Sequence, residues 1–290
     1  FITNDNEPKK YLKNKGIKHF KINLKQNNQI INKLETIRPN LIILDTYQLK
    51  INFKRKLFDK YKNILVIDDD FKNKQFCKYY LNYNFLNKKN KQNLRKKIKA
   101  KKFLIGHNYF LSDLKNNLKK RKKNKVVVFF GSTDKFKIMN KTLKIISNKI
   151  FQKFKFYIII GKYYNLNTSK FKNSNLKFLN TLSSKKFYNL LKTSEYAIGA
   201  GGVSLMERVL LGLINFVIVT AKNQTLGVKL LNNKKIIKFA GNANEISYSI
   251  YKKRLISFFF NKKKSIVIKK RLRKIKYNKG LDKVYNKISF

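Results

Sequence analysis

Short runs of apolar residues recur along the chain, and most of them end at an Asp, a Gly or a Thr. The runs are continuous, without alternation of apolar and polar residues, and they are rich in Ile, Val, Leu and Phe. This pattern is typical of strands that are buried on both faces of a parallel sheet. We therefore predict strands over residues 40–44, 63–67, 103–105, 126–130, 156–160, 175–179, 196–198 and 214–219.

Amphipathic stretches separate these runs, and three of them have the apolar spacing of helices: residues 138–151, 184–192 and 203–213. The last segment, 246–290, also has a helical pattern, apart from a short apolar patch at 257–260. Strands that alternate with helices indicate an α/β fold with doubly wound parallel sheets.

A stretch of Lys, Asn and Leu at 114–125 carries no strand signal and precedes a new strand–glycine–helix start. We therefore expect two Rossmann-like doubly wound domains, an N-terminal one over 1–115 and a C-terminal one over 124–290. The first has fewer predicted strands than a complete domain of this type, and the chain has no initiator Met. We expect the first domain to be truncated at its N-terminus.

The composition excludes several classes of protein. A hydrophobic fraction of 43% in 290 residues is too high for an intrinsically disordered chain. The one cysteine, Cys77, excludes an intrachain disulfide and a multi-cysteine zinc site. No apolar run approaches the ~20 residues of a membrane-spanning helix, and because the chain opens on the strand-like Phe1-Ile2-Thr3 we expect no signal peptide. We expect a cytoplasmic monomer with no membrane span.

The charge of the chain is strongly positive, with 69 Lys and Arg against 14 Asp and Glu. The excess is almost all Lys, it is spread along the chain, and it accompanies abundant Asn, Ile, Phe and Tyr, which AT-rich codons encode. Solvated lysines set by codon composition are therefore the favoured interpretation, and a functional polyanion-binding surface is the alternative. Arg, the better residue for reading base edges, is scarce, so we expect no specific nucleic-acid partner.

Three glycines, Gly199, Gly201 and Gly202, join a predicted strand to a predicted helix. Glycine lets a backbone approach a ligand closely, and a helix N-terminus attracts anions, so a diphosphate suits this junction. The alternative is a tight turn with no ligand. Ser204 and Glu207 stand three residues apart, which fits either a capping box or a Glu207 that holds a ribose diol.

Two other strand ends carry polar residues, in Gly131-Ser132-Thr133-Asp134 and in Asn223-Gln224. In an open α/β sheet, ligands bind beyond the carboxyl ends of the strands, so these loops and the glycine junction are expected to converge. Asn223 suits sugar hydroxyls or phosphate oxygens, and its alternative role is to cap a helix. The sequence thus predicts a diphosphate-bearing ligand on the second domain.

The other candidate groups give weaker evidence of a functional role. Asp68, Asp69 and Asp70 are adjacent, so they do not face one point, and a strand-end loop is favoured over a metal site. His107 follows a predicted strand and is interpreted as a loop residue, while His19 is expected to be exposed. We expect no metal and no cofactor, and two histidines do not support a Ser/His/Asp or Cys/His arrangement.

Several of these segments together resemble a known family. They are residues 40–47, 64–70 with Cys77, 103–109, 127–134, 197–207 with Asn223-Gln224, and 279–282. The chain resembles the UDP-2,4-diacetamido-2,4,6-trideoxy-β-L-altropyranose hydrolases of pseudaminic acid biosynthesis, which are relatives of the MurG-type glycosyltransferases. The resemblance runs over most of the chain and implies the GT-B architecture of two Rossmann-like domains.

The resemblance also implies that the second domain binds UDP. Gly201 and Gly202 would cradle phosphate, and Glu207 would hold the ribose. Asn223 would contact the phosphate–sugar region, and uracil would lie beside Phe178-Leu179-Asn180, where backbone groups would contact it. The further candidates for UDP binding at the same strand ends are Gly131, Ser132, Ser204 and Gln224.

The implied reaction is attack of water on the anomeric carbon, which releases UDP without a metal. The family's general base is a His in an N-terminal glycine-rich loop that would precede Phe1, so no residue of this sequence is assigned as catalytic. A substrate-contacting Arg of the family falls on Asp113, which leaves the identity of the sugar open. The alternatives are a UDP-sugar-dependent glycosyltransferase and a non-enzymatic polyanion-binding protein.

Overall fold

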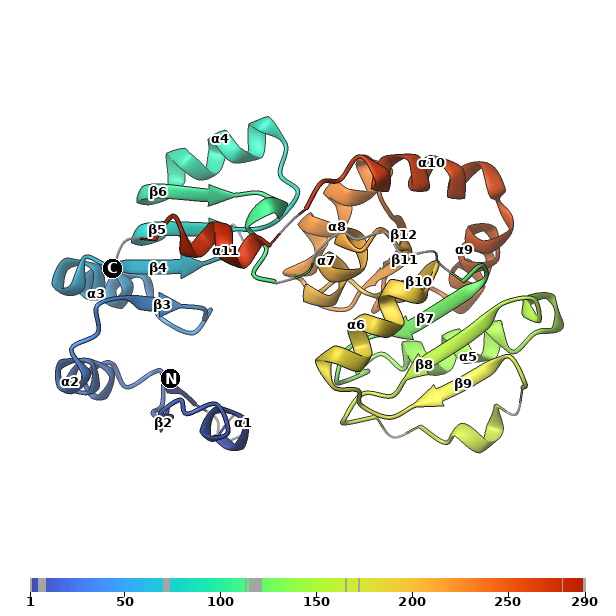
Figure 1. Cartoon of the computed structure of the whole chain (residues 1–290), viewed down its shortest axis with the longest axis horizontal. Helices are drawn as coiled ribbons and strands as arrows, with labels where there is room; N and C mark the ends of the chain where they lie inside the picture. The colour runs from blue at the N-terminus through green and yellow to red at the C-terminus, as the bar shows by residue number, and fades with distance from the viewer. Residues whose placement is uncertain are drawn as a thin grey trace. The chain divides into compact units, whose positions relative to one another are not determined.

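The computed structural model describes residues 2–4, 9–69, 74–112, 114, 122–164, 166–171, 173–277 and 279–288. The chain divides into two compact units, each built around a parallel sheet (Figure 1). Unit 1 comprises Phe1–Tyr83, Asn87–Ile105 and Val284–Phe290, and unit 2 comprises Asn84–Leu86 and Gly106–Lys283.

Unit 2 contains a six-stranded parallel sheet. Its strands are β7 (Lys125–Phe129), β8 (Lys155–Ile159), β9 (Leu176–Leu179), β10 (Tyr196–Ala200), β11 (Ile214–Val219) and β12 (Lys238–Asn242). The spatial order is β12-β11-β10-β7-β8-β9, so the chain builds outward from β7 to one edge and then from β10 to the other. This is the doubly wound order, and its topological switch point lies between β7 and β10.

The strands of unit 2 are buried in the way that their apolar runs predict. Every residue of β10 and of β11 is buried, whereas the edge strands β9 and β12 are partly accessible. The predicted parallel, doubly wound sheet is therefore confirmed. Among the described residues, no helix is both long enough and apolar enough to cross a lipid bilayer.

The helices of unit 2 follow the strands. They are α5 (Ile138–Ile146), α6 (Ser184–Thr193), α7 (Val203–Leu210), α8 (Gln224–Asn233), α9 (Tyr248–Phe260) and α10 (Lys262–Arg273). The patch at 257–260 was expected to lie apart from the helices, and this is wrong because it forms the last turn of α9. Phe259 packs there against Phe154, with ring centroids 4.6 Å apart, so tertiary burial explains its apolar character.

Unit 1 contains a four-stranded parallel sheet in the order β3-β4-β5-β6 and a separate parallel pair, β1 and β2. The strands are β1 (Ile2–Thr3), β2 (Phe20–Lys21), β3 (Ile42–Leu44), β4 (Ile64–Ile67), β5 (Phe76–Asn82) and β6 (Lys99–Ile105). The helices are α1 (Lys9–Lys13), α2 (Asn27–Ile37), α3 (Ile51–Tyr61) and α4 (Lys88–Lys97), and α11 (Gly280–Tyr285) ends in this unit. Cys77 is fully buried within β5, as its small apolar side chain suggests.

Candidate functional site

The two central strands of unit 2 end in glycine-containing loops at the switch point. Gly131 follows β7 with a φ of 104°, a conformation that side chains rarely adopt, and Gly201 and Gly202 follow β10. Strands β7 and β10 are paired in parallel, with Gly199 opposite Phe129. Because the carboxyl ends of paired parallel strands meet at one edge, the two loops lie side by side at the position where ligands bind in such sheets.

The two helices that begin beside this edge differ in how their N-termini are satisfied. In α5, the carboxylate of Asp134 accepts hydrogen bonds from the backbone N–H of Ile138 (2.8 Å) and of Met139 (2.7 Å). In α7, the N-cap is Gly202, and no side chain caps the helix. Backbone N–H groups at an uncapped N-terminus carry partial positive charge. Of these two helices, α7 therefore offers donors to an anion, whereas Asp134 occupies those of α5.

The structure contradicts the capping-box interpretation of Ser204 and Glu207. Since Gly202 is the N-cap, Ser204 is the second residue of α7 and Glu207 is the fifth. Glu207 does not fold back on the helix, because its Oε1 accepts a hydrogen bond from the hydroxyl of Tyr188 on α6 at 2.7 Å. No hydrogen bond from another described residue reaches Oε2 of Glu207, so that oxygen is able to accept one from a ligand.

Glu207 is half-buried, and this alters its titration. Burial raises the pKa of Glu207, while the Tyr188 hydrogen bond and the charge of Arg208 act in the opposite direction. The net upward shift means that the folded protein holds the proton of Glu207 more tightly than an unfolded chain does. The ionised carboxylate is thus held at a cost in stability.

We predict that Glu207→Gln makes unit 2 more stable at pH 7. The amide keeps an oxygen that accepts from Tyr188 and removes the buried charge. Because its carboxyl pKa is raised, the wild-type protein loses stability as the pH rises through the interval above the ordinary pKa of Glu. The stability gain of the variant should therefore vanish below about pH 4. Thermal unfolding of the variant and the wild type at pH 7 and at pH 3.5 measures this gain as a difference in melting temperature. Equal melting temperatures at pH 7 would contradict the prediction, and Glu245→Gln, at an exposed acid of unit 2, is the control.

Gln224 joins two of the loops at this edge. Its Oε1 accepts hydrogen bonds from the backbone N–H of Gly201 (3.2 Å) and from the backbone N–H of Thr220 (3.0 Å), which follows β11. The sequence predicts Gln224 as a ligand contact, and the structure uses its carbonyl oxygen to position the glycine loop. Asn223 occupies the N-cap position of α8 without a side-chain capping bond, so the alternative role of a capping Asn is wrong.

Arg208 is a residue of the site that sequence reasoning missed. Its side chain is 1% exposed, and its guanidinium donates from Nε to the carbonyl of Ser204 at 3.1 Å and from Nη2 to the carbonyl of Ala200. Burial lowers the pKa of Arg208 to about 10, so it is still a cation at neutral pH. A fixed positive charge behind the glycine loop favours an anionic ligand in front of it. Nothing in the sequence distinguishes this Arg from a solvated one.

The remaining predicted UDP contacts lie at the same edge. Ser132 is exposed directly after Gly131, and Leu179 ends β9, two strands away from β7. With neighbouring strands ~4.8 Å apart, Leu179 is about 10 Å from β7 across the sheet. The carbonyl of Leu179 accepts a hydrogen bond from the N–H of Ile160 at 2.8 Å, so that carbonyl is already engaged within the sheet.

The sheet of unit 1 carries acidic residues at its own carboxyl edge. Asp45 follows β3, and Asp68 and Asp69 follow the neighbouring strand β4. Partial burial and the charge of Asp69 raise the pKa of Asp45, and Tyr80 donates a hydrogen bond to Asp68 at 2.9 Å. In the described part of the chain, no three His, Cys, Asp or Glu side chains are grouped to hold a metal ion. Asp70 and Asp113 lie outside the described residues.

The two histidines lie in short connecting segments. His107 begins a short 3₁₀ helix after Gly106, and its ring stacks on Phe85 with centroids 4.4 Å apart and an interplanar angle of 5°. This agrees with its interpretation as a loop residue. His19 is half-buried, so the expectation that it is exposed is wrong, and the reason is that it directly precedes β2.

Comparison with solved structures shows the fold of the whole chain. It is similar to MurG of Acinetobacter baumannii, with a TM-score of 0.66 and 11% identity over 97% of this chain and 87% of that one. The glycotransferase of kitacinnamycin gives a TM-score of 0.62 and 10% identity over 98% and 90% of the two chains. Arabidopsis thaliana UGT89C1, complexed with UDP-L-rhamnose, gives 0.60 and 10% over 87% and 70%.

These similarities show that the chain has the GT-B fold of MurG-like and UGT-like proteins. No protein-family model matches the sequence, and the comparison with curated proteins found no match. The fold expected from the sequence is therefore confirmed. Sequence identities of 10% and 11% show the fold alone.

Proposed function

We propose that the chain acts on a UDP-sugar and that unit 2 binds the UDP portion at the switch point between β7 and β10. The observation that carries the proposal is the uncapped N-terminus of α7 beside Gly131, with a half-buried Glu207 farther along the same helix. The backbone of Gly202 approaches the diphosphate, because a Cβ there would have Nε2 of Gln224 as its nearest neighbour, at 3.7 Å, whereas Gly201 packs against Val228 and Gln224. The cation of Arg208 behind the loop favours the negative charge.

Glu207 accepts a hydrogen bond from the ribose through Oε2 while Tyr188 holds Oε1. Glu207 lies five residues after Gly202, which is about 7.5 Å along a helix axis, so one helix reaches both the diphosphate and the ribose. Ser132, Ser204 and Asn223 supply polar groups around the phosphates and the first sugar. Uracil extends across the sheet edge toward Leu179, the end of β9.

We propose hydrolysis as the reaction, as in the pseudaminic-acid hydrolases that the sequence resembles. Water attacks the anomeric carbon and gives up one proton to the solvent, the bond between that carbon and the UDP oxygen breaks, and UDP leaves as the anion that unit 2 binds. The role of unit 2 is to orient the diphosphate and to stabilise its charge as the bond breaks. The sequence resemblance supports water as the acceptor of the sugar.

Glycosyl transfer is the second candidate, because two of the similar structures are MurG and the glycotransferase of kitacinnamycin. One assay separates the two reactions. The protein is incubated with a set of UDP-sugars in buffer alone, and UDP and free sugar are quantified by chromatography. Release of both in equal amounts supports the hydrolase, whereas UDP release that requires an added acceptor alcohol supports the transferase.

Binding of polyanions by the lysine-rich surface is the weakest of the three readings. It gives no role to the glycine loops, to the hydrogen bonds by which Gln224 joins two of the loops, or to the contact of Tyr188 with Glu207. Absence of any UDP binding in calorimetry would remove the proposal that unit 2 is a UDP site, whichever acceptor is used.

A further inference from the structure

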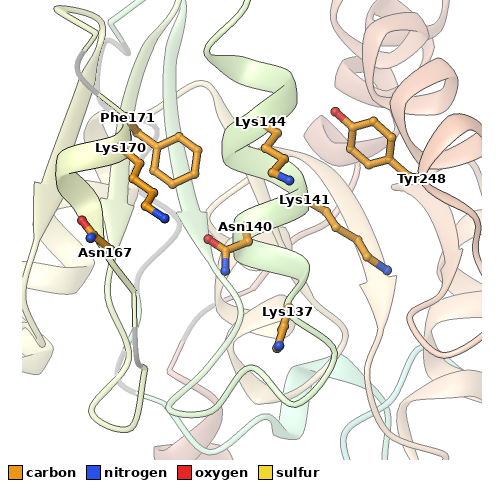
Figure 2. Close-up of a pocket in the computed structure, with 8 residues that line it drawn as sticks. All are labelled: Lys137, Asn140, Lys141, Lys144, Asn167, Lys170, Phe171 and Tyr248. Carbon is orange, nitrogen blue, oxygen red and sulfur yellow. The ribbon is translucent and has the colours of Figure 1, made fainter.

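A lysine-lined groove lies on the outer side of α5 in unit 2, and it has a volume of about 720 Å³. Its lining residues come from α5, from the segment between β8 and β9, and from the start of α9 (Figure 2). They are Lys137, Asn140, Lys141, Lys144, Asn167, Lys170, Phe171 and Tyr248. This volume falls in the range of small-molecule sites.

The positive charge of the groove has no acidic partner among the residues that the structure describes. Lys137, the N-cap of α5, and Lys141 and Lys144 within the helix stand at spacings of four and three residues, so they form a row of ~10 Å along α5 that ends in its last turn. None of the eight lining residues is acidic, and none of the four lysines forms an ion pair with a residue that the structure describes. The nearest acid in sequence, Asp134, is engaged with the first N–H groups of α5.

Aromatic rings and amides flank this row of lysines. Phe171 is half-buried on one side of α5, next to Lys170, and Tyr248 is 41% exposed on the other side (Figure 2). The Oδ1 of Asn167 accepts a hydrogen bond from the N–H of Ser169 at 3.1 Å, so this amide oxygen is engaged within its own turn. A cationic row with an adjoining aromatic face and an amide is the combination that binds phosphates together with a nucleobase.

A second groove of unit 2 shows that lysines alone do not produce this combination. It has a volume of about 350 Å³ and is lined by four lysines together with Asn232, Ile237, Val267 and Ile268. Its lysines are Lys235, Lys238, Lys263 and Lys264. It has the same number of cations, half the volume and no aromatic lining residue, so it provides a control of matched charge.

We infer that the groove over α5 binds a nucleoside polyphosphate, with its phosphates on Lys137, Lys141 and Lys144 and its base against Phe171. This site is separate from the proposed UDP site, because it lies along the side of α5, whereas the UDP site lies at the glycine loops of the sheet edge. The inference does not depend on the reaction that the protein catalyses.

The test is calorimetric titration with ATP and with inorganic tripolyphosphate at one fixed salt concentration. The double variant Lys141→Gln/Lys144→Gln should weaken ATP binding at least tenfold. The charge-matched control Lys235→Gln/Lys263→Gln should change it less than twofold, because screening weakens the effect of distant charges. An equal loss in both double variants would mean that net charge alone attracts ATP, and the inference would be overturned.

Two further measurements identify the ligand and separate the sites. Phe171→Leu keeps apolar bulk without a flat ring, so it should weaken ATP binding about fivefold and leave tripolyphosphate binding unchanged, as loss of base stacking does. Equal effects on both ligands would overturn the assignment of a nucleoside. ATP binding should persist in Glu207→Ala, and its loss there would place ATP at the glycine loops instead. Failure of UDP binding alone would leave this inference standing.

Discussion

Gly199→Ala is expected to destabilise unit 2 by about 3 kcal/mol, at the upper end of overpacking effects. A Cβ at this position in β10 would overlap the carbonyl oxygen of Phe129 and Nη1 of the buried Arg208. Neither neighbour is able to retreat easily, because Phe129 belongs to the paired strand β7 and Arg208 is held by two backbone carbonyls. Urea-induced unfolding, followed by circular dichroism, measures the loss.

Gly202→Ala is the matched control for this prediction. A Cβ there would have Nε2 of Gln224 as its nearest neighbour at 3.7 Å, which is an ordinary contact, and the backbone of Gly202 is extended. Its effect on stability should stay within about 0.5 kcal/mol, as for substitutions that meet no packed neighbour. If the two variants are equally stable, the close packing of β10, β7 and Arg208 is not what holds the glycine loop in place.

The fold could be predicted from the sequence because most strands of this protein are continuous apolar runs that end at a glycine or a polar residue. Two strands of the four- and six-stranded sheets lack this signal and were missed, as was the short pair β1 and β2. Lys78 interrupts the apolar run of β5, and β12 contains a glycine and lies at a sheet edge. In both cases tertiary pairing stabilises a strand whose local pattern is weak.

The candidate site was less accessible to sequence reasoning than the fold. The glycines and the carboxyl edge follow from the order of strands and helices, since parallel strands bring their ends together. The hydrogen-bond donor to Glu207, Tyr188, comes from α6, nineteen residues earlier, and Gln224, which accepts from the glycine loop, comes from α8. Contacts between elements distant in sequence leave no local pattern, and nothing local in the sequence marks Arg208 as buried.

Glu207→Ala is expected to weaken UDP binding by about 1–3 kcal/mol, the range of a hydrogen bond to a charged group. The change removes the carboxylate whose Oε2 is available to the ribose, and it leaves the hydroxyl of Tyr188 without its acceptor. The variant should lose affinity for UDP and for uridine but keep its affinity for pyrophosphate, because the glycine loop and the N-terminus of α7 are unchanged. Calorimetric titration with the three ligands measures this pattern.

The matched control is Glu245→Ala, which removes the same charge from an exposed position of unit 2. In a chain of net charge +55, the loss of any acid strengthens the general attraction of anions, so the control should bind UDP no more weakly than the wild type. A loss of affinity specific to Glu207→Ala therefore runs against the electrostatic trend and identifies a direct contact. Unchanged UDP affinity in Glu207→Ala would mean that the ribose is not held by this helix, and the proposed orientation of UDP along α7 would have to be abandoned.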